Sequence, residues 1–382
     1  MRNYLILFLF NSLFLVSLQS ITFIYKDYGS QNNHLVIMAG GVGSRFWPMS
    51  TEEKPKQFID VLGTGRTLLQ LTFDRFEGIC DPENVWVVTN KKYAALVQEQ
   101  LPEIPAGNIV QEPCRRNTAP CVAYISWRIK EKDPNANIVV SPSDHIVTNS
   151  NEFRRVIISA LKFTGETDSI VTLGMKPTRP ETGYGYIQGD LRTPSARNKE
   201  VYRVDQFHEK PDLETAKKYL SDKNFFWNAG IFIMSAATIV NAFRVYQPAI
   251  AKIFESLRPI YGTPQEQEQI DLRYPECENI SIDYAIMEKA EEIFVFPASF
   301  GWSDLGTWGS LLAQSRRDLY GNATIGKNIQ MIESKNNIVH TLNEKKVVIQ
   351  GLEGYIVAEE DGTLLICKMS EEQRIKQFSG MN

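Results

Sequence analysis

The stretch LVIMAGGVGSRFWPM, from Leu35 to Met49, decides the fold of this chain. It starts with a short, wholly apolar run, which is typical of a strand buried on both faces of a parallel sheet. The run leads directly into a glycine-rich turn, where backbone N–H groups approach phosphate oxygens without hindrance from a Cβ atom. The turn lacks the third glycine of a Rossmann fingerprint and the GK[ST] ending of a Walker A loop. We therefore predict a different phosphate-binding loop, which carries Arg45.

Outward from this stretch, strand-like and helical patterns alternate. Further short apolar runs occur at 85–89, 137–141 and 170–173. The clearest helical pattern covers 118–130, with one apolar face and Asn117 as its N-cap. Strands that alternate with helices predict an open, mostly parallel, Rossmann-like α/β sheet.

The pattern changes in the second half of the chain. Segments 184–188 and 201–207 have the pattern of antiparallel or edge strands, and 281–290 that of a short helix. Short apolar runs separated by turn signals then predict a small all-β region. We expect three parts: an apolar segment 1–30, a catalytic domain 31–317 and a small β domain 318–382.

Composition excludes several classes of protein. A hydrophobic fraction of 43% and a charged fraction of 23% over 382 residues are ordinary for a globular chain that buries its own core. Acidic and basic side chains are interspersed to a net charge of -4, so we expect no nucleic-acid partner. The five cysteines form no C-x-x-C pair, which argues against a disulfide framework or a zinc ribbon and fits a reducing compartment.

Two aspartates lie in motifs suited to a metal ion. Asp144 lies in SPSDH, at the carboxyl end of a predicted parallel strand, where ligands bind in open α/β folds. Asp304 lies in the aromatic motif WSDLGTW, 160 residues further along the chain. Mg²⁺ takes oxygen ligands and usually binds one or two carboxylates together with phosphates. Alone, an SDH turn is more often a helix cap, and the second aspartate favours the metal site.

The glycine loop continues into WPMS and then KPKQF at 54–58. This block resembles the signature of the sugar nucleotidyltransferases, and in particular of the bacterial, monofunctional mannose-1-phosphate guanylyltransferases. The resemblance runs from about His34 to the C-terminus. It implies a GT-A-like nucleotidyltransferase domain, followed by a short left-handed β-helix-like domain without a clear hexapeptide repeat. It also implies that GTP and mannose 1-phosphate are converted to GDP-mannose and pyrophosphate with Mg²⁺.

The resemblance implies roles for particular residues of this chain. We expect Asp144 and Asp304 to bind the metal and, with the cations Arg45, Lys56 and Lys210, to form the catalytic set. The residues expected to bind the nucleotide are Ala39, Gly40, Gly41, Gly43, Ser44, Arg45, Glu112, Asn117, Thr118, Ala119 and Ser143. Those expected to bind the sugar phosphate are Gly183, Tyr184, Glu209, Lys210 and Asn228. His145 is expected to have a supporting role.

The segment QEPCRRNTAP, 111–120, resembles the part of the family that recognises the base. The carboxylate of Glu112 is suited to accept the N1–H and N2–H₂ of guanine, and it repels the carbonyl that uracil or thymine presents there. The helix that starts near Thr118 is expected to turn its N-terminus towards the phosphates or ribose. Many relatives have glycine around Cys114 and Arg115, so this chain departs from the family pattern there.

On the sugar side, a lysine at position 210 is suited to pair with the sugar phosphate, and Glu209 and Asn228 to hydrogen-bond the sugar hydroxyls. Relatives usually have valine where this chain has His208, and we expect a tolerated substitution there. Some relatives carry an additional isomerase domain, for which this chain has no room, so we expect a single activity and a homodimer.

Alternatives stay open. One alternative keeps the enzyme class and changes the substrates to another pair of nucleoside triphosphate and sugar 1-phosphate. A second alternative comes from another class of protein: a catalytically inactive, nucleotide-binding regulatory paralogue. Such a paralogue is expected to have lost residues that bind phosphate or metal, and this sequence retains them. Segment 1–30 is an upstream extension, a membrane anchor or a signal peptide, and only Arg2 supplies the positive charge of a signal. Because the substrates are intracellular, we expect a cytoplasmic protein, with membrane contact only if this segment belongs to it.

Overall fold

The computed structural model describes residues 32–41, 43–342 and 344–380, except for the side chain of Ser44. The predictions for segment 1–30 lie outside these residues. None of the helices within the described ranges is long and apolar enough to cross a membrane.

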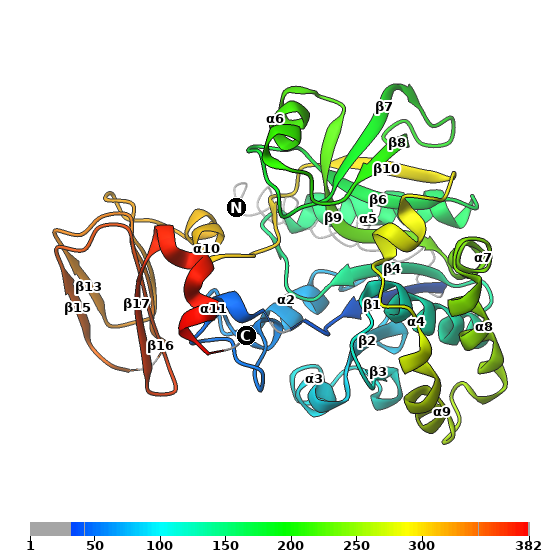
Figure 1. Ribbon diagram of the computed structural model, residues 1–382, viewed down its shortest axis with the longest axis horizontal. Coiled ribbons are helices and arrows are strands. Elements are labelled where there is room, and N and C mark those ends of the chain that lie inside the picture. Colours follow the sequence, from blue (N-terminus) through cyan, green and yellow to red (C-terminus); the bar gives the residue numbers. More distant parts are fainter. Residues whose placement is uncertain (1–31, 42, 343, 381–382) are drawn as a thin grey trace, which may run out of the picture.

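A nine-stranded sheet forms the centre of the molecule, with the order β3-β2-β1-β4-β9-β6-β10-β8-β7 (Figure 1). Its strands are β1 (Asn33–Met38), β2 (Val85–Asn90), β3 (Ile109–Glu112), β4 (Asn137–Pro142), β6 (Ile170–Met175), β7 (Tyr186–Pro194), β8 (Tyr202–His208), β9 (Phe225–Ser235) and β10 (Ile293–Ala298). Strands β8 and β9 run opposite to the other seven. The predicted open, mostly parallel α/β sheet is therefore confirmed, with β7 and β8 at one edge.

Strand β1 lies between two parallel neighbours, β2 and β4. Its side chains alternate between the two faces of the sheet: Val36 belongs to one apolar cluster, and Leu35 and Ile37 belong to the other. All three are fully buried, which explains why the run from Leu35 to Met38 is apolar without interruption. Because parallel strands end at the same edge, β1 and β4 deliver the glycine loop and the SPSDH motif side by side.

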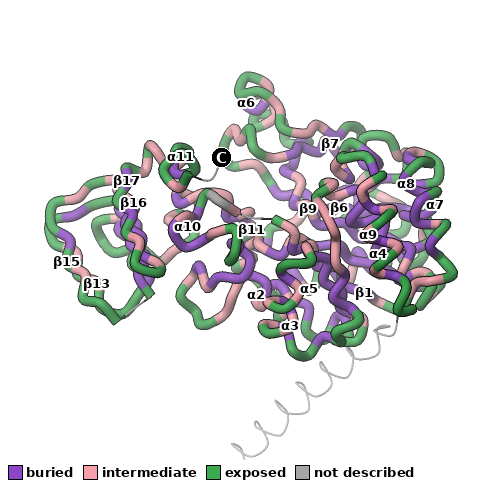
Figure 2. The backbone as a smooth tube through the Cα atoms, turned by 60° about the horizontal axis from the view of Figure 1, so that its bottom comes forward, coloured by how far each residue is buried: buried purple, intermediate pink, exposed green. Residues whose placement is uncertain are grey.

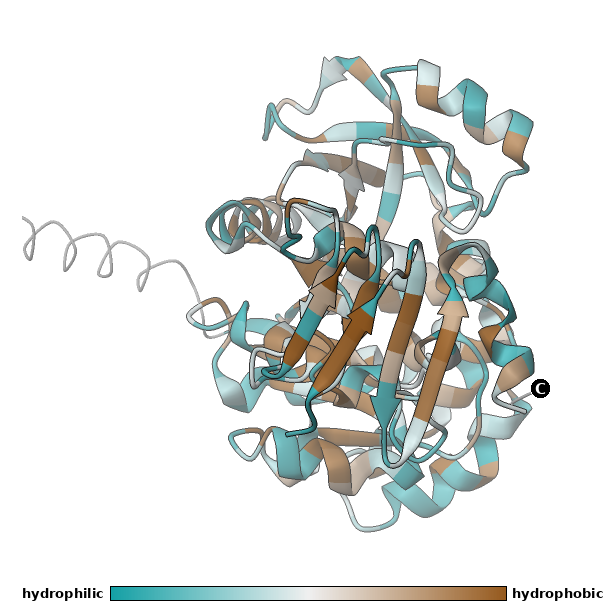
Figure 3. Ribbon diagram, turned by 90° about the vertical axis from the view of Figure 1, so that its left-hand side faces the viewer, coloured by the Kyte–Doolittle hydropathy of each residue, from teal (hydrophilic) through white to brown (hydrophobic). Residues whose placement is uncertain are grey.

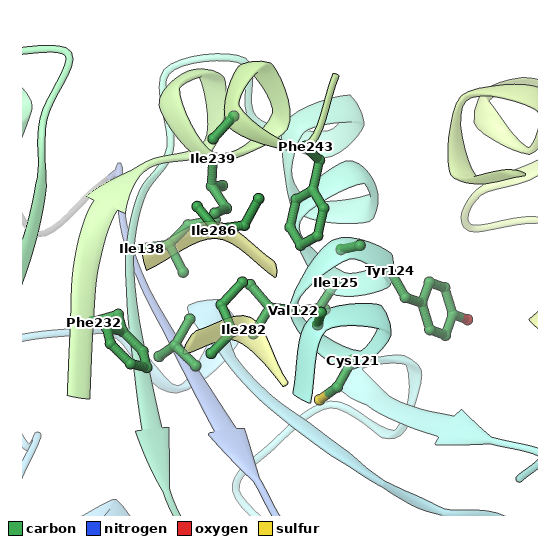
Figure 4. Close-up of a cluster of buried hydrophobic side chains, with 14 of the residues drawn as sticks. Cys121, Val122, Tyr124, Ile125, Ile138, Phe232, Ile239, Phe243, Ile282 and Ile286 are labelled. Atoms are coloured by element: carbon green, nitrogen blue, oxygen red, sulfur yellow. The ribbon is translucent and has the colours of Figure 1, made fainter. Parts of the chain in front are cut away.

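Helices cover both faces of the sheet. The α-helices within the described ranges are α2 (Leu68–Asp74), α3 (Ala94–Gln100), α4 (Thr118–Lys132), α5 (Ser150–Gly165), α6 (Leu213–Ser221), α7 (Ala236–Tyr246), α8 (Pro248–Ser256), α9 (Glu266–Arg273), α10 (Trp308–Gln314) and α11 (Ile375–Phe378). Figure 4 shows the packing on one face, where Val122 and Ile125 of α4 meet Phe243 of α7. The buried residues of Figure 2 are concentrated in the strands and in the inner sides of these helices. Helix α4 confirms the predicted helix and its cap, since the side chain of Asn117 accepts a hydrogen bond from the N–H of Thr118.

The predicted helix 281–290 was wrong in type and length. The chain forms a single π-helical turn, η9 (Asp283–Met287). Ile282 and Ile286 are buried against α4 and α7, as the pattern indicated. The wide turn places these apolar side chains in the core and Asp283 beside the sheet strand β9.

The C-terminal strands form two small parallel stacks with one antiparallel addition (Figure 3). They are β12 (Ala323–Ile325), β13 (Ile329–Ile332), β14 (Ile338–His340), β15 (Val347–Gln350), β16 (Tyr355–Glu360) and β17 (Thr363–Lys368). Strands β12, β14 and β16 pair in parallel, as do β13 and β15, which confirms a β-helix-like region. We propose residue 318 as its start.

The expectation of an all-β C-terminal region was wrong at its end. After β17, the chain forms the 3₁₀ helix η10 (Met369–Arg374) and then α11. The physical reason is Ile375, which is fully buried in an apolar cluster together with Phe46 and Trp308. Figure 1 shows α10 and α11 between the C-terminal strands and the central sheet.

Candidate active site

A cavity of about 280 Å³ lies where the glycine loop, the SPSDH motif and the WSDLGTW motif meet. It is lined by Gly43, Arg45, Phe46, Lys56, Asp144, His145, Asp304, Gly306 and Lys376. All but one of the residues predicted to be catalytic are in this lining, and the exception is Lys210. Among the predicted catalytic residues in this lining, the structure brings together Arg45 and Asp304, which are 259 positions apart in the sequence.

The KPKQF motif holds the glycine loop in place. The side-chain amide of Gln57 donates hydrogen bonds to the carbonyl oxygens of Ala39 (3.0 Å) and Gly41 (2.8 Å). Gly43 has a φ of 62°, and a Cβ atom there would lie 2.4 Å from the Cβ of Lys56. Only glycine therefore allows the loop to pass so close to the motif that supports it. Arg45 lies two residues after Gly43 and is exposed at the cavity.

Lys56 connects the two aspartate motifs. Its ammonium group lies 2.8 Å from Oδ2 of Asp144 and donates hydrogen bonds to the carbonyl oxygens of Asp304 (3.0 Å) and Leu305 (2.9 Å). The lysine side chain is only 5% exposed, so these contacts are shielded from water. Burial alone would raise the pKa of Asp144, but the charges of Lys56 and His145, together with hydrogen bonds from Lys56 and the backbone, outweigh burial and lower the pKa below its usual value.

A short two-stranded sheet explains how the distant aspartates meet. Strand β5 (Ile146–Val147) follows Asp144, and β11 (Trp302–Ser303) precedes Asp304. The two strands pair antiparallel, with Ser303 opposite Ile146, so the carboxylates are brought to the same cavity.

The side chain of Asp304 is oriented by two hydrogen bonds. Its Oδ1 accepts from the hydroxyl of Tyr184 (2.6 Å) and from the backbone N–H of Gly306 (3.0 Å). Burial and the charge of Asp304 both raise the pKa of Tyr184, so its hydroxyl stays protonated and keeps donating. Tyr184, predicted to bind the sugar phosphate, thus also supports a predicted metal ligand.

His145 supports the same site from behind. Its Nδ1 accepts a hydrogen bond from the indole N–H of Trp302 (3.2 Å), and its Nε2 lies 3.8 Å from Oδ1 of Asp144. Burial lowers the pKa of His145 in spite of the neighbouring aspartates. These contacts match the supporting role that the sequence predicted for this residue.

The donor set of the cavity fits a divalent cation. Two carboxylates reach it from opposite motifs, and both are hard oxygen donors of the kind that Mg²⁺ prefers. Within the described ranges, no group of three or more His, Cys, Asp or Glu side chains has the geometry of a metal site. A pair of carboxylates suits an ion that completes its shell with water and substrate phosphates.

The predicted base-recognition residue lies beside the glycine loop. A Cβ atom on Gly40 would lie 3.3 Å from Oε2 of Glu112, and Oε1 of Glu112 accepts a hydrogen bond from the hydroxyl of Tyr274. Burial raises the pKa of Glu112 to about 7, although hydrogen bonds from Tyr274 and Cys121 act in the opposite direction. Sequence reasoning missed Tyr274, because nothing in its local pattern connects it to a residue 162 positions away.

The start of α4 is already engaged within the protein. The N–H of Thr118 donates to the side chain of Asn117 (2.9 Å), and the N–H of Ala119 donates to the carbonyl of Ile280 (3.1 Å). The hydroxyl of Thr118 accepts from the N–H of Ile282 (2.8 Å). Nucleotide contacts by Asn117, Thr118 and Ala119 therefore stay a prediction.

Two serines were also predicted to bind the nucleotide. Ser143 is buried, and its N–H donates to the carbonyl of Met38 (3.2 Å), which fixes the SPSDH motif against the end of β1. Ser44 starts the 3₁₀ helix η2 (Ser44–Phe46), and its side chain lies outside the description. Their contacts with a nucleotide stay predictions.

A second cluster contains the predicted sugar-side residues. The N–H of Asn228 donates to the carbonyl of Gly185 (2.8 Å), and its side chain donates to Oδ1 of Asp283 (3.1 Å). A Cβ on Gly185 would lie 2.6 Å from Oε2 of Glu209, so this glycine leaves room for the glutamate. Lys210 pairs with Glu209 and is mostly exposed. Lys210 does not line the cavity of the aspartates.

Sequence reasoning missed Asp283. Burial, together with the charge of Glu209, raises the pKa of Asp283 to about 6. The only signal in the sequence was a lone carboxylate in the apolar stretch 281–287, which is too little to assign a role. Of the predicted sugar-side residues, Gly183 lies at the exposed approach to this cluster, where its N–H donates to Oε1 of Glu181 (3.1 Å).

A larger cavity, of about 740 Å³, is lined by Tyr184, Trp227 and Trp302 among others. None of the five residues predicted to be catalytic is among the described residues that line it. We therefore assign the chemistry to the smaller cavity, where the charged groups converge.

Comparisons with known proteins agree with this geometry. Residues 34–320 match the family model described as nucleotidyl transferase. Mannose-1-phosphate guanylyltransferase 2 of Escherichia coli O157:H7 is 35% identical over 361 residues, which cover 91% of this chain and 72% of that protein. Alginate biosynthesis protein AlgA of Pseudomonas fluorescens is 35% identical over 350 residues, covering 90% of this chain and 70% of that protein.

A solved structure gives the same result. The crystal structure titled "mannose-1-phosphate geranyltransferase" of Thermus thermophilus superposes with a TM-score of 0.81 at 29% identity, and the match covers 92% of this chain and 99% of that chain. Sequence, fold and the convergence of the motif residues thus agree. The chain belongs to the nucleotidyl transferase family, within its group of mannose-1-phosphate guanylyltransferases.

Proposed function

We propose that this protein transfers the guanylyl group of GTP to α-D-mannose 1-phosphate and releases pyrophosphate. Enzymes of its family act on a nucleoside triphosphate and a sugar 1-phosphate with the help of a divalent metal ion. The observation that carries the proposal is the single cavity that collects the glycine loop, Arg45, Lys56 and the two aspartates.

The reaction forms a bond between an oxygen of mannose 1-phosphate and the α-phosphorus of GTP. The bond from that phosphorus to the bridging oxygen of the β-phosphate breaks, and the electron pair leaves with pyrophosphate. The attacking oxygen is already anionic at neutral pH, so no general base is needed. Rate enhancement then depends on positioning and on neutralising phosphate charge.

Asp144 and Asp304 would hold the metal ion, for which we propose Mg²⁺. The ion, when bound, offsets the repulsion between the two phosphates and polarises them. Tyr184 fixes the carboxylate of Asp304, and Lys56 fixes that of Asp144. The chain therefore sets the positions of both ligands before any substrate binds, which lowers the cost of assembling the reactive complex.

We assign the cationic side chains to two groups of the reaction, the leaving pyrophosphate and the attacking sugar phosphate. Arg45 is exposed at the cavity beside the glycine loop, and we assign it to the leaving pyrophosphate. Lys56 holds the two aspartate motifs together, and its charge also faces the cavity. Lys210 lies beside Glu209 in the sugar cluster, and we assign it to the attacking phosphate.

Glu112 supports the choice of base. Its carboxylate lies beside Gly40 and in reach of the nucleotide loop. An ionised carboxylate accepts two N–H groups from the edge of guanine, but it meets a carbonyl oxygen on uracil or thymine. This argument favours GTP and does not by itself distinguish sugar epimers, for which the similarity to mannose-1-phosphate guanylyltransferases is the support.

We further propose a cytoplasmic homodimer, in which membrane contact depends on segment 1–30. Intracellular substrates support the location. Exposed apolar side chains on the outside of the C-terminal strands, including Val348, Leu364 and Ile366, support self-association.

The test is pyrophosphate release by the purified protein with Mg²⁺. Four nucleoside triphosphates are combined with the 1-phosphates of mannose, glucose, galactose and N-acetylglucosamine, and Asp304→Asn serves as the inactive control. We expect release only with GTP and mannose 1-phosphate. Release with another pair would overturn the assignment of the base or the sugar. Binding of GTP without release from any pair would favour an inactive regulatory paralogue.

A further inference from the structure

One cation of the catalytic cavity comes from neither the glycine loop nor the aspartate motifs. Lys376 lies on α11, in the last described turn of the C-terminal region, and it lines the cavity together with Arg45 and Lys56. We propose that Lys376 is a catalytic residue that the C-terminal region contributes to the nucleotidyltransferase site, where it binds the pyrophosphate part of GTP. This inference rests on the proposed function.

The position of Lys376 is fixed by its neighbours in the chain. Ile375 is fully buried in the cluster that also holds Phe46 and Trp308, whose rings are 5.3 Å apart. In the preceding helix η10, Oε2 of Glu372 accepts a hydrogen bond from the N–H of Gly309 (2.8 Å). Helix α11 is therefore anchored by apolar packing and by a polar contact.

The anchor places α11 directly beside the phosphate loop. Phe46, which packs in the same cluster as Ile375, immediately follows Arg45. Helix α11 contacts η2, the helical turn that carries both Arg45 and Phe46. Lys376 thus lines the cavity from the C-terminal region, and Figure 1 shows α11 between the C-terminal strands and the catalytic domain.

The charges of the cavity favour an anionic ligand near Lys376. Lys56 is paired with Asp144, whereas Arg45 and Lys376 are exposed and form no ion pair with any described residue. The lining carries three cations, Arg45, Lys56 and Lys376, against the two carboxylates of Asp144 and Asp304, so its excess of positive charge favours an additional anion. Pyrophosphate and the β- and γ-phosphates of GTP supply that charge, and charge-assisted hydrogen bonds to phosphate are among the stronger polar contacts in proteins.

The location selects the leaving phosphates over the attacking one. Lys376 shares the cavity with Gly43 and Arg45 of the glycine loop. Lys210 and Glu209, the predicted partners of the sugar phosphate, do not line this cavity. A role at the pyrophosphate predicts an effect on GTP and pyrophosphate, and little effect on mannose 1-phosphate.

The test compares Lys376→Ala with the wild-type protein in both directions of the reaction. We expect KM for GTP, and KM for pyrophosphate in the reverse reaction, to rise about tenfold, which is the scale of one charge-assisted hydrogen bond. KM for mannose 1-phosphate should change by less than about twofold, because Lys376 lies on the pyrophosphate side. Lys376→Arg keeps the charge and should recover most of the affinity.

Lys368→Ala is the matched control, since Lys368 is an exposed lysine at the end of β17 that does not line the cavity. It should behave like wild type, and all variants should share one melting temperature. Wild-type KM values for GTP and pyrophosphate in Lys376→Ala would overturn the inference, as would an equal rise in KM for mannose 1-phosphate. Equal losses in Lys376→Arg and Lys376→Ala would also overturn it.

The inference and the proposed function fail in different ways. If the wild-type protein turns over another substrate pair, the same comparison is made with that pair, because every nucleoside triphosphate releases pyrophosphate. If it turns over none, calorimetric titration with GTP and Mg²⁺ measures the Kd for GTP of the wild type and of Lys376→Ala. An unchanged Kd in Lys376→Ala would then overturn the role of Lys376.

Discussion

At the scale of single residues, Lys56 shows how a side chain predicted for one task has a second one. Its ammonium group neutralises Asp144 and binds the carbonyl oxygens of Asp304 and Leu305. We expect Lys56→Met to lower kcat/KM by at least about a hundredfold, because both metal ligands lose their common support. The free energy of unfolding should fall by about 2 kcal/mol, since a buried partner is removed from a carboxylate and two carbonyls. Steady-state kinetics and urea denaturation measure the two effects.

The control for this prediction is Lys54→Met, two residues earlier. Lys54 is about half exposed and pairs with Glu360 at 3.4 Å, an arrangement that contributes little to stability. Its substitution should leave activity and stability close to wild type. If Lys56→Met were as active as Lys54→Met, the proposed support of the aspartates would be wrong.

The second prediction at this scale concerns pH. Burial raises the pKa of Glu112 to about 7. Above that pH the carboxylate is ionised and accepts two N–H groups of guanine, and below it one oxygen carries a proton and no longer accepts. If only the ionised form binds GTP well, KM for GTP should rise about tenfold between pH 8 and pH 6. Initial rates over this range measure the change.

Glu112→Gln separates this effect from the ionisation of GTP itself. The variant should bind GTP more weakly at pH 8, and any slope that it keeps reports the ionisation of the substrate. An identical slope in the variant and the wild type would sink the assignment of the pH dependence to Glu112.

At this scale, the sequence predicted that certain residues lie together where those residues occur in recognisable motifs, and their roles stay predictions. Asp144, Asp304, Arg45 and Lys56 were expected to converge, and they line one cavity. Tyr274, Asp283 and Lys376 were missed for the opposite reason: each is a single polar residue in a segment without a motif. Their positions depend on tertiary contacts, which periodicity and spacing do not encode.

At the scale of elements, the glycine loop depends on one backbone conformation. Gly43 has a φ of 62°, and an added Cβ would lie 2.4 Å from the Cβ of Lys56. Gly43→Ala must therefore strain the backbone and push η3 (Lys56–Phe58) away from the loop. We expect a loss of about 2 kcal/mol in stability and a rise in KM for GTP that exceeds the rise for mannose 1-phosphate. Thermal denaturation and kinetics test both parts.

Gly107→Ala is the matched control, because a Cβ there meets nothing within 4 Å and the residue has no positive φ. It should leave stability and KM unchanged. A Gly43→Ala protein with the stability and KM of Gly107→Ala would show that the loop does not need this conformation.

Buried elements were the most predictable ones. The strands β1, β2, β4 and β6 lie where short, mostly apolar runs indicated, because strands buried on both faces carry few polar residues. The strands β5 and β11 are only two residues long and are more than 150 residues apart in the sequence, so no local pattern predicts their pairing. The π turn η9 was missed in type, since its apolar spacing also fits an ordinary helix.

At the scale of the whole molecule, the C-terminal region is part of the catalytic unit through a shared core. Trp308 of α10, Phe46 of the phosphate loop and Ile338 of β14 belong to one apolar cluster. This cluster is the joint between the C-terminal region and the phosphate loop. The sequence predicted the C-terminal strands but not which residues form the joint, because they come from three distant segments. Packing of this kind ties the stability of the C-terminal strands to that of the active site.

His340 makes this joint sensitive to acid. The residue is fully buried on β14, and its ring lies 6.3 Å from that of Trp308. Burial lowers the pKa of His340 from its usual value near 6.5 to about 4. Below pH 6.5 the imidazole of His340 is protonated in the unfolded chain but stays neutral in the folded protein. The free energy of unfolding therefore falls as the pH drops from about 6.5 to 4. By this linkage, His340 should cost about 2 kcal/mol at pH 5 relative to pH 7.

Urea denaturation of the wild type and of His340→Leu at pH 7 and pH 5 measures this cost. A leucine at position 340 does not titrate, so the stability of this variant should fall between the two pH values by about 2 kcal/mol less than that of the wild type, whatever its stability at pH 7. His208→Leu serves as the control, because His208 is only partly buried and lies far from the cluster around Trp308; it should keep most of the slope. If His340→Leu loses stability with acid as steeply as the wild type, the acid sensitivity has another source. If His340→Leu loses about 2 kcal/mol less than the wild type, the single buried histidine accounts for that part of the acid sensitivity, and it lies beside Trp308 of the cluster that joins the C-terminal region to the phosphate loop.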